Sequence, residues 1–254
     1  MPYDKRQIAR NFSAAAERYD SAADIQRESG RLLLEHAGST FSDNLNGQIL
    51  LDIGAGSGRF SRQLQTQGAE VYALDLAEGM LRHIRRITPD FPCILADAEH
   101  LPLPENSADF CFSNLTVQWC SLSRTLAEMR RVTKPGGTIA VSTLADGSLA
   151  QLKQAWQAAD SSPHVNTFLN TSDITSAAAD ADIRLHNLTA RFPCLRELLH
   201  SLKTIGANHV GNRSGGLTGK HRWQRFVQTY EAFRDTDGLY PLDYRIATIV
   251  IRLP

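Results

Sequence analysis

An acidic residue and three closely spaced glycines follow an apolar run near residue 50. Asp52-Ile-Gly-Ala-Gly-Ser-Gly58 comes directly after the strand-like Ile49-Leu-Leu51 and before a helix-like stretch from Arg59 to Gln67. A strand, a glycine turn and a helix N-terminus present backbone N–H groups to a nucleotide-like ligand. Glycine also allows close backbone approach, because it has no Cβ. The run therefore predicts a binding turn, with a plain strand-to-helix turn as the alternative.

The spacing of the glycines indicates which ligand this turn binds. A dinucleotide fingerprint that starts at Gly54 and Gly56 needs its third glycine at residue 59. That residue is Arg59, and the third glycine is Gly58. An acid two residues before alternate glycines resembles motif I of class I S-adenosylmethionine-dependent methyltransferases. This resemblance places five residues of the turn against the cofactor: Asp52, Gly54, Ala55, Gly56 and Gly58.

Acidic residues also end the next two predicted strands. Asp75 lies 19 residues after Gly56, where a carboxylate can accept hydrogen bonds from both ribose hydroxyls of an adenosine. Asp75-Leu-Ala-Glu78 equally fits a helix capping box, and both roles can hold together. In the methyltransferase pattern the acid at Asp97 accepts from the adenine amine; the alternative is an ordinary acidic loop. The same pattern adds further cofactor contacts: Leu76, Met80, Ala98, Glu99 and Asn114.

The segment after the fourth predicted strand should meet the methyl acceptor. It reads Ser113-Asn-Leu-Thr-Val-Gln-Trp119. It lacks an Asn/Asp-Pro-Pro-Tyr run, which argues against exocyclic amines of nucleic acid or glutamine as methyl acceptors. It also lacks a Pro-Cys nucleophile of the kind used on pyrimidine carbon 5. Trp119 is either an acceptor contact or plain core packing. Tyr19, beside Asp20, is either a ligand contact or a buried aromatic residue that hydrogen-bonds through its hydroxyl.

These residues must be positioned by an alternation of strands and helices. Residues 5–36 read as helical, with Ile8, Phe12, Ala15 and Tyr19 on one stripe. Strands are expected at 49–53, 70–74, 93–96, 109–113, 138–143, 183–192 and 245–253, and helices at 58–67, 77–87, 121–132, 149–159, 195–205 and 223–233. A turn is expected at 134–137 and a loop at 206–222.

Continuous apolar strands between helices predict an α/β fold whose parallel sheet is covered on both faces. We expect a doubly wound, mostly parallel, seven-stranded sheet in a Rossmann-like, class I methyltransferase arrangement. Residues 1–46 would form an N-terminal helical extension and 47–254 the methyltransferase domain. A helical lid, at about 194–240, would be inserted before the last strand, which would close an antiparallel hairpin.

Composition narrows the class of protein. The 254 residues contain 27 basic and 27 acidic side chains, so attraction to nucleic acid is not expected to be the main activity. No apolar run approaches the roughly 20 residues that span a bilayer, and the charged N-terminus shows no secretory signal. The four cysteines lack metal-type spacing, which indicates no metal site and reduced thiols. A cytoplasmic enzyme without membrane or nucleic-acid partners is expected.

Five segments together resemble one family. IARNFSAAAERYD, LLDIGAGSGRFS, SNLTVQW, GSLAQLKQAWQAAD and SLKTIGANHV are similar to the malonyl-acyl carrier protein O-methyltransferases of biotin biosynthesis. The resemblance implies methyl transfer from S-adenosylmethionine to the free carboxylate of a malonyl thioester on acyl carrier protein. The resulting ester hides a charge and starts the pimeloyl chain of biotin. Malonyl coenzyme A is an alternative acceptor, and the sequence does not fix the oligomeric state.

This reaction does not require a general base from the protein. A carboxylate with a reference pKa of about 4 is already ionised at neutral pH, so no general base is required. The protein must align oxygen, methyl and sulfur for in-line displacement. We expect Tyr19 and Gln118 to orient the acceptor. The other expected acceptor contacts are Trp119, Lys203, His209 and Arg213.

A basic surface is expected to dock the acidic carrier protein. The sequence offers two candidates, the run 220–225 and the arginines Arg82, Arg85 and Arg86, and each is equally a solvated helix face. Three other functions compete with the family's. The first is a methyltransferase that acts on a small molecule such as a quinone precursor. The second is a nicotinamide-dependent dehydrogenase, and the third is a protein that binds adenosylmethionine without turnover. Arg59 argues against the dehydrogenase, as does the lack of a Tyr-x-x-x-Lys pair.

Overall fold

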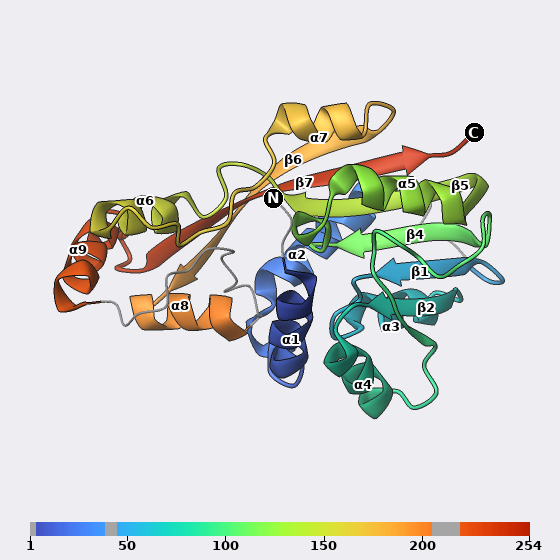
Figure 1. The fold of residues 1–254 in the computed structure, drawn as a ribbon, viewed down its shortest axis with the longest axis horizontal. Helices are drawn as coiled ribbons and strands as arrows, with labels where there is room; N and C mark the ends of the chain where they lie inside the picture. Colours follow the sequence, from blue (N-terminus) through green and yellow to red (C-terminus); the bar gives the residue numbers. More distant parts are fainter. Residues whose placement is uncertain (1–3, 39–44, 205–218) are drawn as a thin grey trace.

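A computed structural model describes residues 4–38, 45–204 and 219–254. Its centre is a seven-stranded sheet of order β3-β2-β1-β4-β5-β7-β6, in which β1 to β5 run parallel and β7 is antiparallel to both neighbours. This confirms the predicted doubly wound, mostly parallel α/β fold (Figure 1). The strands are β1 (Ile49–Ile53), β2 (Glu70–Asp75), β3 (Cys93–Leu95), β4 (Ala108–Asn114), β5 (Thr133–Leu144), β6 (Asp182–Phe192) and β7 (Tyr240–Arg252).

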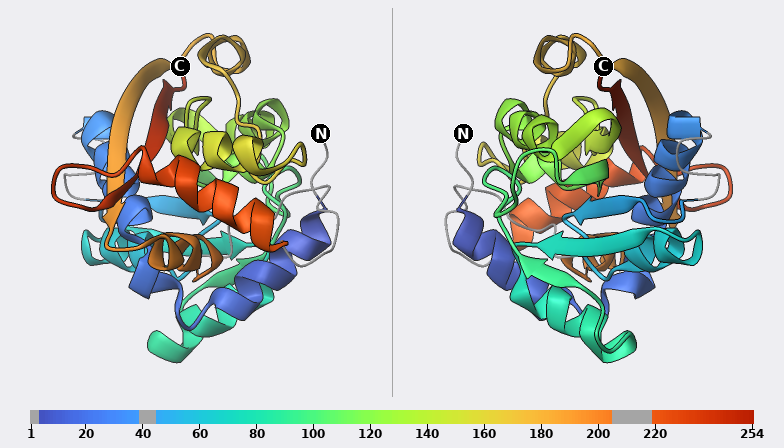
Figure 2. Two further views of the ribbon diagram at one scale, coloured as in Figure 1. Left: turned by 90° about the vertical axis from the view of Figure 1, so that its left-hand side faces the viewer. Right: turned by 90° about the vertical axis from the view of Figure 1, so that its right-hand side faces the viewer.

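Helices cover both faces of the sheet (Figure 2). Successive strand residues point to opposite sides, so Leu50 packs in one apolar cluster while Leu51 packs in the other. The first cluster includes residues of α2 (Asp24–Ala37), α3 (Arg59–Thr66) and α4 (Glu78–Ile87). The second includes residues of α5 (Leu122–Val132) and α7 (Thr171–Ala177). Strands apolar on both sides are what a sheet buried between two helical layers requires.

The N-terminal segment is not one continuous helix, and the prediction of a helical stretch from 5 to 36 is wrong at its middle. Helix α1 (Lys5–Ala15) ends before a 3-10 turn, η1 (Tyr19–Ala22), and α2 follows. The Arg18 N–H donates to the Ala15 carbonyl and closes α1. The Ser57 hydroxyl donates to Asp20 at 2.6 Å, so η1 is held against the glycine turn. The break brings Tyr19 toward the carboxyl ends of the strands.

The C-terminal third forms the predicted antiparallel hairpin, because β6 pairs with β7 along its whole length. Strand β7 begins at Tyr240, earlier than expected, and α9 (Lys220–Glu231) begins inside the expected loop 206–222. Helices α6 (Ala150–Ala159), α8 (Leu195–Thr204) and α9 contribute to a third apolar cluster with the start of β7. Figure 1 shows α6 and α9 near the start of β7 and α8 near the end of β6, with α1 between these helices and α4.

The expected turn at 134–137 is instead part of β5. Gly136 has a φ of +76°, and the pairing of β4 with β5 shifts register between Ala108 and Phe110. Gly136 and Gly137 therefore lie in an irregular part of β5, and the strand begins before them, at Thr133. Helix α7 was not expected from the sequence. Among the described residues, no helix is long and apolar enough to span a membrane.

Candidate active site

Two cavities meet where η1 and α1 face the carboxyl ends of the strands. The smaller, of about 80 Å³, lies over the ends of β1, β2 and β3, and the larger, of about 340 Å³, lies among α2, α6, α8 and the 3-10 turn η3 (Val117–Trp119). Four residues line both: Phe12, Tyr19, Leu115 and Trp119. A ligand in one cavity would therefore lie beside a ligand in the other.

The glycine turn borders the smaller cavity and requires glycine. Gly54 has a φ of +75°, and a Cβ there would lie 2.1 Å from Oγ1 of Thr116. Gly56 has a φ of +54° and donates its N–H to Asp75 at 2.9 Å. Both conformations are strained for residues with a side chain. The conformation of the turn is thus fixed, and the backbone of Gly54 and Gly56 borders the cavity without a side chain over it.

Asp75 closes its own loop and lines the smaller cavity. Its second carboxylate oxygen accepts the Ala77 N–H at 2.7 Å. The N-cap of α4 is Ala77, which makes no side-chain cap hydrogen bond among the described residues, so the alternative of a capping box at Asp75 is wrong. Burial raises the pKa of Asp75, although its backbone hydrogen bonds, first those from Ala77 and Gly56, oppose the rise. Each carboxylate oxygen has further lone pairs, so Asp75 can still accept hydrogen bonds from a ligand hydroxyl.

Asp52 lies deeper than Asp75. Its side chain is buried and accepts a hydrogen bond from the Ser61 hydroxyl at 2.5 Å. Burial raises the pKa of Asp52 to about 7, even though the Ser61 hydrogen bond acts in the opposite direction. Asp52 also lines a small third cavity together with Ala55, and Gly54 and Gly56 line both this cavity and the smaller one. The structure thus leaves Asp52 out of the lining of the smaller cavity, which Asp75 borders.

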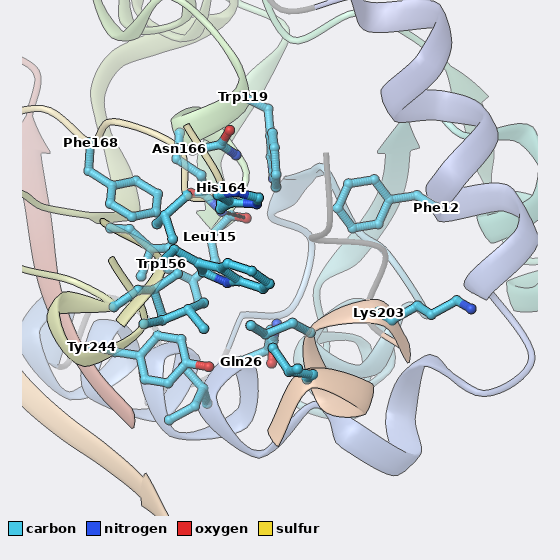
Figure 3. A pocket seen from close by; sticks show the side chains of 18 of the residues that line it. Phe12, Gln26, Leu115, Trp119, Trp156, His164, Asn166, Phe168, Lys203 and Tyr244 are labelled. Atoms are coloured by element: carbon cyan, nitrogen blue, oxygen red, sulfur yellow. Dashed lines mark hydrogen bonds between the residues drawn. The ribbon is translucent and has the colours of Figure 1, made fainter. Parts of the chain in front are cut away.

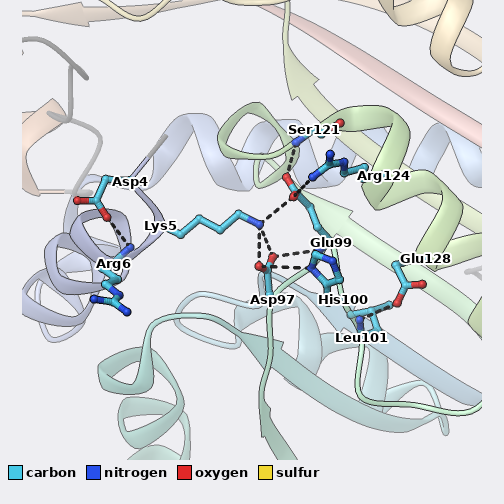
Figure 4. Close-up of polar contacts among 10 residues, drawn as sticks. All are labelled: Asp4, Lys5, Arg6, Asp97, Glu99, His100, Leu101, Ser121, Arg124 and Glu128. Carbon is cyan, nitrogen blue, oxygen red and sulfur yellow. Dashed lines mark hydrogen bonds and ion pairs between the residues drawn. The ribbon is translucent and has the colours of Figure 1, made fainter. Parts of the chain in front are cut away.

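Asp97 is joined to the N-terminal helix by an ion pair that the sequence did not reveal. Lys5 Nζ lies 2.6 and 2.8 Å from its two carboxylate oxygens and 2.9 Å from Oε2 of Glu99 (Figure 4). Glu99 also accepts the Ser121 N–H at 2.6 Å. Although desolvation opposes it, the Lys5 ammonium holds the pKa of Asp97 below its ordinary value. An ionised carboxylate with spare lone pairs thus stands at the cavity, and α1 is fixed over it.

Seven of the twelve predicted cofactor residues line the smaller cavity, whereas Asp52, Ala55, Gly58, Met80 and Glu99 do not. Those that line the smaller cavity are Gly54, Gly56, Asp75, Leu76, Asp97, Ala98 and Asn114. Gly58 instead lies close to α4, where a Cβ would come within 2.7 Å of Ile84. Met80 is fully buried in a cluster with Ala16 and Ala77. These two positions support the wall of the cavity rather than its surface.

The smaller cavity suits a nucleoside. Two acidic side chains, Asp75 and Asp97, offer acceptors to hydroxyl and amino donors, and apolar side chains lie between them for a flat ring. The glycine turn leaves the backbone accessible next to Asp75. The donors, acceptors and apolar walls therefore fit S-adenosylmethionine, which combines a ribose, an adenine and a charged methionine tail. Among the described residues, no group of three potential ligands could hold a metal ion.

Aromatic side chains form the boundary between the cavities. The rings of Phe12 and Trp119 meet edge to face at 5.8 Å, and Tyr19 lies 6.4 Å from Phe12. Burial, and secondly the charges of Asp75 and Asp20, raise the pKa of Tyr19 above its ordinary range. The Tyr19 hydroxyl therefore keeps its proton and acts as a donor, not as a base.

The larger cavity brings together four of the six predicted acceptor contacts. Tyr19, Gln118, Trp119 and Lys203 line it, whereas His209 and Arg213 lie outside the described residues. Gln118 Nε2 donates to the Leu115 carbonyl at 2.5 Å, which orients its amide oxygen. The structure adds lining residues that the sequence analysis missed: Gln26, Trp156, His164, Phe168 and Tyr244 (Figure 3). The helical spacing of Phe12 from Ile8 could have indicated that Phe12 lines the cavity. No such pattern could have indicated His164, because it lies in an irregular segment.

Known proteins resemble this chain along its whole length. Residues 51–141 match the methyltransferase domain family. A malonyl-[acyl-carrier protein] O-methyltransferase of Yersinia pestis is 45% identical, covering 98% of this chain and 91% of that protein. The biotin biosynthesis bifunctional protein BioHC of Cellvibrio japonicus is 41% identical over 99% of this chain, which spans 51% of that longer protein.

The solved structures agree on the fold. YcgJ of Bacillus subtilis superposes with a TM-score of 0.58 at 14% identity, covering 90% of this chain and all of that one. A likeness at this level of identity shows only the fold. The sequence similarity to the Yersinia pestis protein is much closer and covers nearly all of both proteins. The chain therefore belongs to the malonyl-[acyl-carrier protein] O-methyltransferase family.

Proposed function

We propose that this protein transfers a methyl group from S-adenosylmethionine to the free carboxylate of a malonyl thioester on acyl carrier protein. The observation that carries the proposal is the meeting of two cavities at Phe12, Tyr19 and Trp119. One has the acceptors and the glycine turn that suit a nucleoside, and the other is large and mainly apolar. The malonyl methyl ester would serve the biotin pathway, to which the similar bifunctional protein belongs by name.

The cofactor would be held by the residues of the smaller cavity. Asp75 would accept from the ribose hydroxyls and Asp97 from the adenine amine, while Leu76 and Ala98 would contact the ring. When bound, S-adenosylmethionine supplies an electrophilic methyl group on a positively charged sulfur. Its methionine end would lie near the glycine turn, where Gly54 and Gly56 leave room for close approach.

The acceptor needs positioning and no deprotonation. A malonyl carboxylate is ionised at neutral pH, so its oxygen attacks without a general base. Tyr19 keeps its proton and lines both cavities, so it can donate a hydrogen bond near the reacting oxygen. Gln118 presents an oriented amide to the larger cavity. The aromatic boundary excludes water from the line of attack.

The basic run 220–225 is the better of the two candidate docking surfaces. All six of its side chains are exposed, and Trp223 within it also lines the larger cavity. Within the run, Arg222 lies 3.4 Å from Asp160. All three arginines of α4 have partners: Arg82 contacts Glu78, Arg86 contacts Glu17, and Arg85 donates to the Cys93 carbonyl. A carrier protein docked on 220–225 would therefore stand at the cavity that receives its thioester, with His209 and Arg213 as further proposed contacts.

Comparison of acceptors tests this function. Initial rates should be measured with malonyl-acyl carrier protein, malonyl coenzyme A and free malonate at one S-adenosylmethionine concentration. We expect the carrier-protein thioester to give the highest kcat/KM. The free acid should be slowest because it has no arm to dock. Faster turnover of a small phenolic or quinone-type acceptor would replace the proposal with the small-molecule alternative. Binding of S-adenosylmethionine without any turnover would leave only a binding protein.

A further inference from the structure

A histidine and an aspartate form a pair in the wall of the larger cavity. His164 Nε2 lies 2.9 Å from Oδ1 of Asp160, the residue that follows α6. The imidazole stacks on Trp156, with ring centroids 4.1 Å apart and an interplanar angle of 16° (Figure 3). The ring keeps 11% of its side-chain surface exposed, and His164 borders the cavity. One ring nitrogen is thus fixed while the residue faces the acceptor site.

The other ring nitrogen has no partner. Nδ1 of His164 is buried, and within the described part of the chain nothing hydrogen-bonds to it. Gln26 Oε1 and Gln118 Oε1 are likewise buried without partners, and both residues line the same cavity. Buried polar atoms without partners are uncommon, because each loses its hydration without compensation. Of the three atoms, only Nδ1 of His164 can carry a hydrogen and donate to a ligand, because the two amide oxygens only accept.

Asp160 carries the negative charge of the pair. Although burial opposes it, the hydrogen bonds from the Ser162 N–H and from His164 hold the pKa of Asp160 below its ordinary value, so Asp160 is ionised. Its contact with Nε2 orients the imidazole and leaves Nδ1 as the second hydrogen-bonding atom of the ring. The charged groups that face the pair are Arg222 of α9, 3.4 Å from Asp160, and Lys203 of α8 on the cavity lining.

We infer that His164, held by Asp160 and stacked on Trp156, binds the carboxylate of the acceptor and so selects a malonyl over an uncharged acyl thioester. The inference rests on the proposed function. With Nε2 committed to Asp160, a ring that is protonated at both nitrogens has one N–H left to donate. It holds one carboxylate oxygen and leaves the other free to attack the methyl group. A guanidinium at this place would bind both oxygens together. Methylation removes the negative charge and weakens this contact, which favours product release.

Binding measurements test the role of His164. Dissociation constants for malonyl- and acetyl-acyl carrier protein should be measured with the wild type, His164→Gln and Asp160→Asn. We expect the wild type to prefer malonyl, and His164→Gln to lose about 10- to 100-fold in malonyl affinity while acetyl affinity stays constant. Asp160→Asn keeps the ring and should lose part of the preference. His200→Gln on α8, a histidine outside this cavity, is the matched control.

A further measurement separates a binding role from a structural one. The affinity for S-adenosylmethionine should be the same in all variants, because His164 does not line the smaller cavity. Retained malonyl preference in His164→Gln, or equal losses for both thioesters, would overturn the inference. Absence of malonyl methylation by the wild type would instead refute the proposed function.

Discussion

At the scale of single residues, two carboxyl groups near the glycine turn, buried Asp52 and half-buried Asp75, differ in their partners. Asp75 accepts two backbone N–H groups and borders the smaller cavity, whereas Asp52 accepts one hydroxyl and does not border it. Both are found by the same sequence signal, an acid at a strand end. That signal does not separate a residue that touches a ligand from one that supports the loop. The difference lies in burial, which depends on how α3 packs.

Asp75→Asn should weaken the binding of S-adenosylmethionine at least about tenfold, since a charged acceptor of two hydroxyls is lost. The new amide also places a donor against the N–H of Gly56 or Ala77. Isothermal titration calorimetry measures the dissociation constant. Asp109→Asn is the control: Asp109 also accepts a backbone N–H, that of Ile49, at the opposite ends of the strands. An unchanged affinity in Asp75→Asn would remove Asp75 from the binding site.

Asp52 should make the stability of the ligand-free protein depend on pH. Its pKa is raised from 3.8 to about 7, so between these values the folded protein holds a proton that the unfolded chain has lost. Stability therefore falls as pH rises, by up to about 1.4 kcal/mol per pH unit from this group. In Asp52→Asn this fall should be absent, while the Ser61 hydroxyl keeps an acceptor. Urea unfolding at several pH values measures it, and equal slopes for both proteins would refute the assignment.

At the scale of elements, the regular alternation was predictable and the departures from it were not. Strands β1 to β4 were found from their apolar runs. The run of β1 is buried on both sides, whereas the edge strand β3 is only partly covered and Leu95 is exposed. The break at η1 was missed because Ile8, Phe12, Ala15 and Tyr19 fit one helical stripe. What ends α1 is tertiary: Asp20 bonds to Ser57 of the glycine turn. The same break carries Tyr19 to the junction of the cavities.

Gly79→Ala should displace α1 from α4 and weaken cofactor binding. A Cβ at Gly79 would lie 2.7 Å from the backbone of Ser13 in α1, and α1 supplies Lys5, Ile8 and Phe12 to the smaller cavity. We expect a several-fold higher dissociation constant for S-adenosylmethionine and faster proteolysis within α1. Gly219→Ala is the control, because no atom of the described residues lies within 4 Å of a Cβ there. Unchanged affinity would show that α1 does not depend on this contact.

At the scale of the whole molecule, the two cavities are built from segments far apart in the chain. Trp156, His164 and Tyr244 come from α6, the segment after it and β7, yet they line one cavity. Local spacing cannot reveal such a site, because the residues meet only through the third apolar cluster. The smaller cavity was largely predictable, since parallel strands bring their carboxyl ends to one edge. Lys5 was not, because its partner Asp97 is 92 residues away.

The docking surface gives a prediction at the same scale. Lys220→Glu combined with Arg225→Glu should raise KM for malonyl-acyl carrier protein about tenfold and leave kcat nearly unchanged, because complementary charge mainly speeds association. Raising salt should reduce the difference from the wild type. Arg82→Glu combined with Arg85→Glu on α4 is the matched charge reversal. If this control raised KM as much, docking on 220–225 would be refuted.

Mass spectrometry of the carrier protein is the decisive measurement of methyl transfer to the malonyl carboxylate. Malonyl-acyl carrier protein is incubated with the enzyme and S-adenosylmethionine, and acetyl-acyl carrier protein is treated in parallel. We expect the mass gain of one methyl group on the malonyl form, removed by an esterase, and no gain on the acetyl form. Methylation of both forms, or of neither while S-adenosylmethionine is bound, would contradict transfer to the malonyl carboxylate.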